Sequence, residues 1–170
     1  MKIPLTQKEL KKMKVGELVH LNGTIYTARD TAHEFLTTNK KSPINLEGAV
    51  IYHCGPIVKL EKGEFKIIAA GPTTSTRIEP FLEKLIKKHR ISAMIGKGGL
   101  SKEAHKTIKG KVVYFCTPGG IASLLAQHIV KVKEVYKLKE LGKVEAIWAL
   151  EVKDFPVIVA IDLKGQSLYI

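Results

Sequence analysis

The stretch Gly71-Pro72-Thr73-Thr74-Ser75-Thr76-Arg77 connects a strand-like apolar run, residues 66–70, to a helix-like run, residues 81–86. A Gly-Pro turn between a strand and a helix leaves the first N–H groups of the helix unpaired, and these groups favour an anion. Four hydroxyl side chains and Arg77 add donors at the same corner, and a guanidinium can bind a carboxylate or phosphate through two hydrogen bonds. The stretch therefore predicts a corner that binds a negatively charged ligand.

Helix capping is the alternative interpretation of the same residues. Ser and Thr before a helix are frequent N-caps, and Thr76 with Glu79 three residues later fits a capping box. The stretch alone leaves both interpretations open, so the choice depends on the rest of the chain.

Two later stretches repeat this order of strand, glycine-containing turn and helix. The first is the apolar run 91–95, the turn 96–99 and the helical pattern 101–108, and the second is the run 112–116, the turn 117–120 and the helical pattern 121–127. Strands that each lead into a helix predict an α/β fold with a mixed, partly parallel sheet. Ligands of such sheets bind beyond the carboxyl ends of the strands, so we expect these turns to converge on one pocket.

Local patterns predict the remaining elements. They are a short helix capped by Thr6 and Glu9, an extended run at 17–28 with a turn or bulge at Asn22-Gly23, a helix at 29–36 capped by Asp30, and a polar loop at 37–46. Further strands are expected at 49–53, at 57–60 and 65–70 around a Lys62-Gly63 turn, and at 144–150, 157–161 and 168–170, with Pro156 between the first two of these last three.

Length and composition fit one compact domain over residues 1–170, because 45% of the residues are hydrophobic. No apolar run approaches the ~20 residues that a membrane span needs, and residues 1–5 lack the apolar core of a secretory signal. The two cysteines, Cys54 and Cys116, are too few for a disulfide framework. We therefore expect a reduced, cytoplasmic protein without a membrane partner.

The net charge of +12 is compatible with a basic nucleic-acid-binding domain. However, the lysines are spread along the chain in pairs such as Lys11-Lys12, Lys40-Lys41 and Lys87-Lys88, and aromatic residues make up only 6%. An anionic metabolite, an acidic partner subunit or a stand-alone anion-binding module suits the charge equally well. We expect no nucleic acid partner, and nucleic-acid binding is the alternative hypothesis.

Familiar catalytic motifs fail on their spacing. Gly96-Lys97-Gly98-Gly99 lacks the spacing of a phosphate-binding loop, although it does place Lys97 on a backbone that a ligand can approach closely. His53 and Cys54 are neighbours on a strand and should point to opposite faces, so we expect core or rim thiols rather than a nucleophile. The two cysteines and six histidines show no ligand spacing, so we expect no metal bound by this chain alone.

Several motifs together resemble the C-terminal part of class I fumarases. They are residues 24–33 (TIYTARDTAH), 71–77 (GPTTSTR), 95–99 (IGKGG) and 148–156 (WALEVKDFP), and the resemblance extends through nearly the whole chain. In bacteria and archaea this part is often a separate chain, the β subunit of a fumarase or an L(+)-tartrate dehydratase. The resemblance implies a swivelling β/β/α domain. Thr31, where alanine is commoner, and Ile78, where methionine is expected, depart from the pattern.

The resemblance also implies an activity and a site. The family members are hydro-lyases that dehydrate a hydroxy-dicarboxylate, with a [4Fe-4S] cluster as Lewis acid whose cysteine ligands belong to the other domain, here the α subunit of an αβ hetero-oligomer. It implies that Arg29, Arg77 and Lys97 bind the substrate. It further implies that Thr73 is the candidate catalytic base, activated by a carboxylate of the partner.

Overall fold

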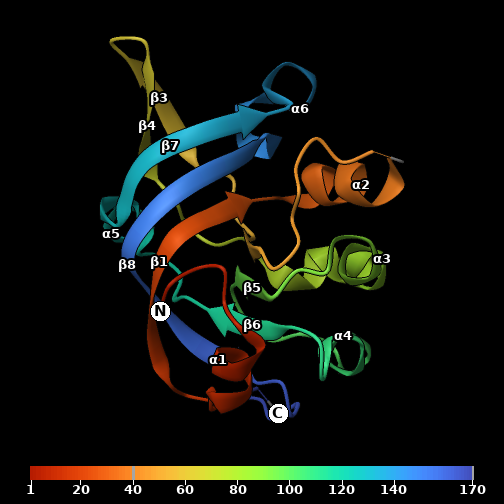
Figure 1. Cartoon of the computed structure of the whole chain (residues 1–170). Coiled ribbons are helices and arrows are strands. Elements are labelled where there is room, and N and C mark those ends of the chain that lie inside the picture. Colours follow the sequence, from red (N-terminus) through yellow and green to blue (C-terminus); the bar gives the residue numbers. More distant parts are fainter. Residues whose placement is uncertain (40, 170) are drawn as a thin grey trace.

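The computed structural model describes residues 1–39 and 41–169. Helices and strands follow one another along the chain as in Figure 1. Their order is α1 (Gln7–Lys12), β1 (Leu18–Thr27), α2 (Asp30–Thr38), β2 (Val50–Tyr52), β3 (Ile57–Glu61), β4 (Glu64–Ala69), the 3₁₀ helix η1 (Ser75–Ile78), α3 (Glu79–His89), β5 (Ala93–Gly96), α4 (Lys102–Ile108), β6 (Val113–Cys116), α5 (Ala122–Gln127), β7 (Ile129–Tyr136), α6 (Leu138–Glu145) and β8 (Ile147–Ile161).

The main sheet has the strand order β1-β2-β5-β6-β8-β7, and the first four strands are parallel. Strand β8 is long enough to pair antiparallel with β6 near its end and with β1 along most of its length. This double pairing joins the two ends of the parallel group into a closed ring, with β7 on the outer edge of β8. The hairpin β3–β4 forms a separate sheet and projects beyond the ring (Figure 1).

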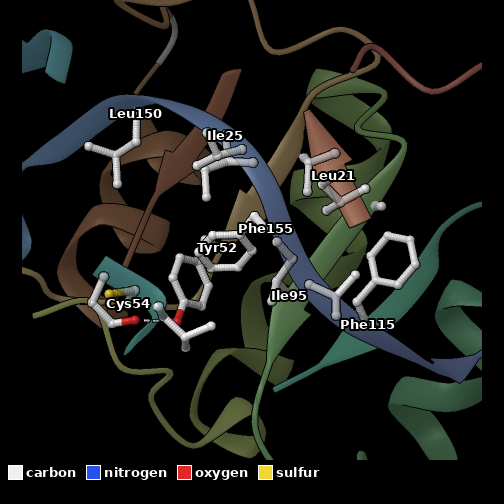
Figure 2. Packing of buried hydrophobic residues seen from close by; sticks show 14 of the residues in the cluster. Leu21, Ile25, Tyr52, Cys54, Ile95, Phe115, Leu150 and Phe155 are labelled. Carbon is white, nitrogen blue, oxygen red and sulfur yellow. Dashed lines mark hydrogen bonds between the residues drawn. The ribbon is translucent and has the colours of Figure 1, made fainter. Parts of the chain in front are cut away.

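Strict alternation in the short parallel strands separates two hydrophobic clusters, because successive side chains point to opposite faces. Val50 and Tyr52 of β2 pack in the cluster inside the ring, whereas Ile51 between them packs under the helices. Figure 2 shows the inner cluster, where the rings of Tyr52 and Phe155 meet edge to face at 5.5 Å. Both faces of β2, β5 and β6 are therefore buried.

Helices α2, α3 and α4 lie in a row on the outer face of the parallel strands (Figure 1). The longest of them, α3, buries Leu82, Leu85 and Ile86, whose spacing by three and four residues makes one apolar stripe. Helices α2 and α4 follow the parallel strands β1 and β5, whereas α3 follows η1, which returns to the same edge through the bridge between Thr74 and Lys97. The first residues of all three helices therefore lie at the carboxyl-end edge of the sheet. This edge carries the turns that the sequence singled out.

Most predicted elements near the central stretch are confirmed. The mixed, partly parallel sheet, the hairpin around Lys62-Gly63 and the capping box of Thr6 with Glu9 are all present. The irregularity expected at Asn22-Gly23 is a register shift against β8.

Two predicted helix caps are wrong. Asp30 is the first residue of α2 rather than its cap, because the carboxylate of Glu145 accepts hydrogen bonds from the N–H groups of Thr31 and Ala32 at 3.0 and 3.4 Å. Glu79 does not form a capping box with Thr76, since its Oε1 accepts from the N–H of Ser101 at 2.7 Å.

The predictions for the last third are partly wrong. Residues 144–145 end helix α6 instead of beginning a strand, and β8 continues through Pro156 without a break. The irregularity lies two residues earlier, at Asp154, which has a φ of +50° and exchanges hydrogen bonds with the Asn22 side chain. Residues 168–169 are not in a strand, while Ile170, like Lys40 of the lysine pair, lies outside the described residues.

Candidate active site

The carboxyl ends of the four parallel strands form one continuous edge. The residues just beyond these ends are linked across neighbouring turns: the N–H of Ala28 donates to the carbonyl of Tyr52 (2.9 Å), that of His53 to Ile95 (2.8 Å) and that of Thr117 to Gly96 (3.0 Å). The hydrogen-bond ladder of the sheet therefore continues past the strands and fixes the turns relative to each other. Arg29 directly follows Ala28 on this edge, and Lys97 directly follows Gly96.

Residues 71–77 return to the same edge after the β3–β4 hairpin. The Tyr52 hydroxyl donates to the carbonyl of Ala70 at 2.5 Å, as drawn in Figure 2, and holds the start of the stretch against β2. The N–H of Thr73 then donates to the carbonyl of His53 at 2.6 Å, and Thr74 forms a parallel bridge with Lys97. Thr73 consequently lies between the turn after β2 and the turn after β5.

Arg29 is held by the carboxylate of Glu145, with Nε 3.5 Å from Oε1. The other oxygen of that carboxylate is the one that caps helix α2, so a single side chain fixes the helix and the arginine beside it. The arginine stem crosses Gly55, where an added Cβ would collide with the Arg29 Cδ and with Val144. A side chain at position 55 would therefore displace Arg29.

Arg77 reaches the start of the same helix from η1. Its Nε lies 3.3 Å from Oδ2 of Asp30, and more than half of the Arg77 side chain is exposed. The ion pair connects the stretch 71–77 to the residue that follows Arg29. The structure thus brings Arg29, Thr73, Arg77 and Lys97, the four residues implied by the resemblance, to one edge of the sheet.

Two buried histidines lie beneath this edge. The rings of His33 and His53 meet edge to face with 5.0 Å between centroids. Nδ1 of His33 is 2.8 Å from the carbonyl oxygen of Arg29, and Nδ1 of His53 is 3.0 Å from Ser75 Oγ. Nε2 of each ring is buried and makes no hydrogen bond within residues 1–39 and 41–169.

Burial keeps both imidazoles neutral. Loss of water lowers the pKa of His33 from 6.5 to about 4, partly opposed by its bond to the Arg29 carbonyl and by the charge of Asp30. Burial also moves the pKa of His53 well below 6.5, and the neighbouring His33 adds to this. At neutral pH these rings are therefore polar anchors for the edge rather than additional cations. Sequence reasoning missed both roles, although His33 lies one helical turn after Arg29.

The thiols do not contribute to the edge. Both cysteines are free and buried, Cys54 in the cluster inside the ring and Cys116 in the cluster under the helices, as expected for core thiols. Burial raises the pKa of the Cys54 thiol to about 12. In the part of the chain that the structure describes, no three His, Cys, Asp or Glu side chains gather as a metal site, and no helix is long and apolar enough to cross a membrane.

Comparison with known proteins assigns the family. The model of the family described as "Fumarase C-terminus" matches residues 1–170. The chain belongs to the fumarase C-terminus family. This membership confirms the resemblance that the motifs around residues 29, 73 and 97 indicate.

Relatives of the fumarase C-terminus family differ in how they are divided into chains. A Methanocaldococcus jannaschii protein named "Putative L(+)-tartrate dehydratase subunit beta" is 50% identical, over 97% of this chain and 88% of its own length. The L(+)-tartrate dehydratase subunit beta of Escherichia coli K12 is 36% identical, over 97% and 83%. A Geobacillus stearothermophilus protein named "Putative fumarate hydratase class I" is 42% identical over 98% of this chain but only 32% of its own length. The chain thus corresponds in extent to the relatives named as subunits.

Proposed function

We propose that this chain is the β subunit of a two-subunit hydro-lyase that reversibly removes water from a hydroxy-dicarboxylate, either malate to fumarate or tartrate to oxaloacetate. The observation that carries the proposal is the meeting of Arg29, Thr73, Arg77 and Lys97 at one edge of the parallel strands. The names of the relatives, which are 36–50% identical where they are called β subunits, supply the reaction class.

The three cations have a defined task in such a reaction. A dicarboxylate carries two negative charges, and removal of the proton beside one carboxylate increases the charge on that group. Arg29 and Arg77 bind the carboxylates, and Lys97 offsets the developing charge, because fixed cations stabilise a transition state more than mobile water does. Glu145 and Asp30 orient the two guanidinium groups before the substrate arrives.

Thr73 is the proposed base. Its hydroxyl takes the proton from the carbon beside the carboxylate, and the hydroxyl group on the neighbouring carbon leaves as the double bond forms. An alcohol is a weak base, so a carboxylate of the α subunit must accept the threonine proton. The hydrogen bond from the Thr73 N–H to the His53 carbonyl supports this role, because it fixes the backbone of the reacting residue.

The α subunit completes the site in this proposal. The resemblance implies a [4Fe-4S] cluster, but the residues of this chain do not fit such a group. The two cysteines lie in different hydrophobic cores, on opposite faces of the sheet, and no set of three potential metal ligands forms among the described residues. The cluster is therefore assigned to the α subunit. In this proposal none of the four residues Arg29, Thr73, Arg77 and Lys97 is a ligand of the iron–sulfur cluster.

Co-production with the α subunit under anaerobic conditions tests the proposal. The assembled complex should dehydrate one member of a panel containing malate and the tartrate isomers, and neither chain alone should do so. Thr73→Val, which keeps the shape of the side chain but removes the hydroxyl, should lower kcat about 10²–10⁴-fold. A complex that assembles but acts on no hydroxy-dicarboxylate would refute the proposed activity, and wild-type turnover by the Thr73→Val complex would refute the assignment of the base.

A further inference from the structure

We propose that Ser75 and His53 are positioning residues, and that the hydroxyl of Ser75, held by Nδ1 of His53, fixes the Lys97 turn against the Thr73 segment. As a statement about catalysis, this inference rests on the proposed function. As a statement about the geometry of the edge, it depends only on contacts within the chain. Neither residue is among the four that the family resemblance implies.

Ser75 forms a closed set of contacts with the Lys97 turn. Its N–H donates to the carbonyl of Lys97 at 3.3 Å, and its Oγ accepts from the N–H of Lys97 at 3.2 Å. Both backbone polar groups of Lys97 are thus satisfied by one residue of the central stretch. Because Ser75 is fully buried, water does not compete for these bonds.

His53 sets the orientation of that hydroxyl. With Oγ accepting from Lys97, the hydroxyl hydrogen is free to donate to Nδ1 of His53, 3.0 Å away. The carbonyl of the same residue accepts from the N–H of Thr73 at 2.6 Å. The backbone carbonyl of His53 therefore holds the backbone of Thr73, the proposed base. The ring of His53 contacts Ser75, and through the Ser75 hydroxyl it is linked to the Lys97 turn.

The absence of a side chain at Gly96 leaves the space that the Ser75 hydroxyl occupies. An added Cβ on Gly96 would overlap Ser75 Oγ, and it would also come within 2.9 Å of the Tyr114 hydroxyl and 3.1 Å of His53 Nδ1. The Tyr114 hydroxyl donates to the carbonyl of Gly98 at 2.9 Å and so supports the other side of the Lys97 turn. The glycine before Lys97 is thus required by a buried polar cluster and not by backbone conformation.

Amide hydrogen exchange of the 170-residue chain tests the geometry without any substrate. In Ser75→Ala the Lys97 N–H loses its acceptor and should exchange at least tenfold faster. The Thr117 N–H, which donates to the backbone carbonyl of Gly96, is the internal control and should keep its rate. An unchanged Lys97 rate in Ser75→Ala overturns the inference, even if the chain has no hydro-lyase activity.

A matched pair at His53 tests the catalytic consequence in the αβ complex. Asparagine places a polar atom where Nδ1 lies, whereas glutamine places one where Nε2 lies, and Nε2 has no partner among the described residues. Ser75→Ala and His53→Gln should lower kcat about 10- to 100-fold with KM changed less than threefold, since small displacements of reacting groups affect mainly the chemical step.

His53→Asn should keep at least ten times the kcat of His53→Gln, and all three complexes should assemble. Equal kcat values for the two His53 variants, or a wild-type kcat for Ser75→Ala, would overturn the inference while leaving the proposed function intact. Absence of activity in the wild-type complex would instead refute the proposed function, and the exchange measurement would then decide the inference.

Discussion

Mild acid should destabilise this chain, because two buried imidazoles must take up protons when it unfolds. His33 has a pKa of about 4 in the folded chain against 6.5 when exposed, so between these values the unfolded chain binds more protons. The contribution of the neutral His33 to the free energy of unfolding is therefore present above pH 6.5 and is lost as the pH falls toward 4. The pKa difference of His33 alone predicts a loss of about 2 kcal/mol between pH 7 and pH 5. His53, whose pKa is also lowered by burial, adds to the loss in the same direction.

Urea unfolding of the chain at pH 7, 6 and 5 measures this loss, which should also lower the melting temperature by about 4–8 °C. His33→Asn should reduce the pH dependence by about 2 kcal/mol, because it removes the titrating ring while its amide can still donate to the Arg29 carbonyl. The same substitution at the exposed His20 is the matched control. Equal stability at pH 5 and pH 7, or an unchanged pH dependence in His33→Asn, would refute the reasoning.

Two further predictions concern single contacts at the edge. Gly96→Ala should cost about 2–3 kcal/mol in urea unfolding, because the added methyl group collides with Ser75 Oγ. In a Ser75→Ala background the cost of Gly96→Ala should be at least about 1 kcal/mol smaller, and an additive double-mutant cycle would contradict this packing. Glu145→Ala should cost about 1 kcal/mol in urea unfolding, because helix α2 loses the side chain that caps it. Glu140→Ala on α6, the helix that also carries Glu145, removes only a surface ion pair with Lys137 and should leave the stability close to that of the wild type. Equal losses in the two variants would count against the cap.

The elements that the sequence predicts well are those determined by neighbouring residues. Short apolar runs followed by glycine-containing turns indicate the strands and helices of the parallel group, and the Lys62-Gly63 turn indicates the hairpin. Strand β7 was not predicted. Apolar residues alternate with lysines in residues 129–136, but none of these residues is buried, and the strand forms through its pairing with the distant β8. Closure of the ring was not predictable either, since it depends on pairing between β1 and β8 across most of the chain.

The same distinction applies to the candidate site. Arg29, Thr73, Arg77 and Lys97 stand in motifs that can be recognised in the sequence, and their roles remain proposals. Their supports come from elsewhere in the chain: Glu145 caps a helix that begins more than a hundred residues earlier, and no local pattern points to it. The contact between His53 and Ser75 likewise exists only because separate turns meet beyond the strands.

The measurement that tests the central claim most directly is kcat/KM of the assembled αβ complex carrying Arg77→Ala. Loss of a guanidinium that binds a substrate carboxylate should lower kcat/KM about 10²–10³-fold, with assembly unchanged. Arg90→Ala, which removes an exposed arginine at the far end of α3 that pairs with Glu47, is the control and should stay within about threefold of the wild type. An Arg77→Ala complex with wild-type kcat/KM would contradict the claim that this chain supplies the cationic half of a dicarboxylate site.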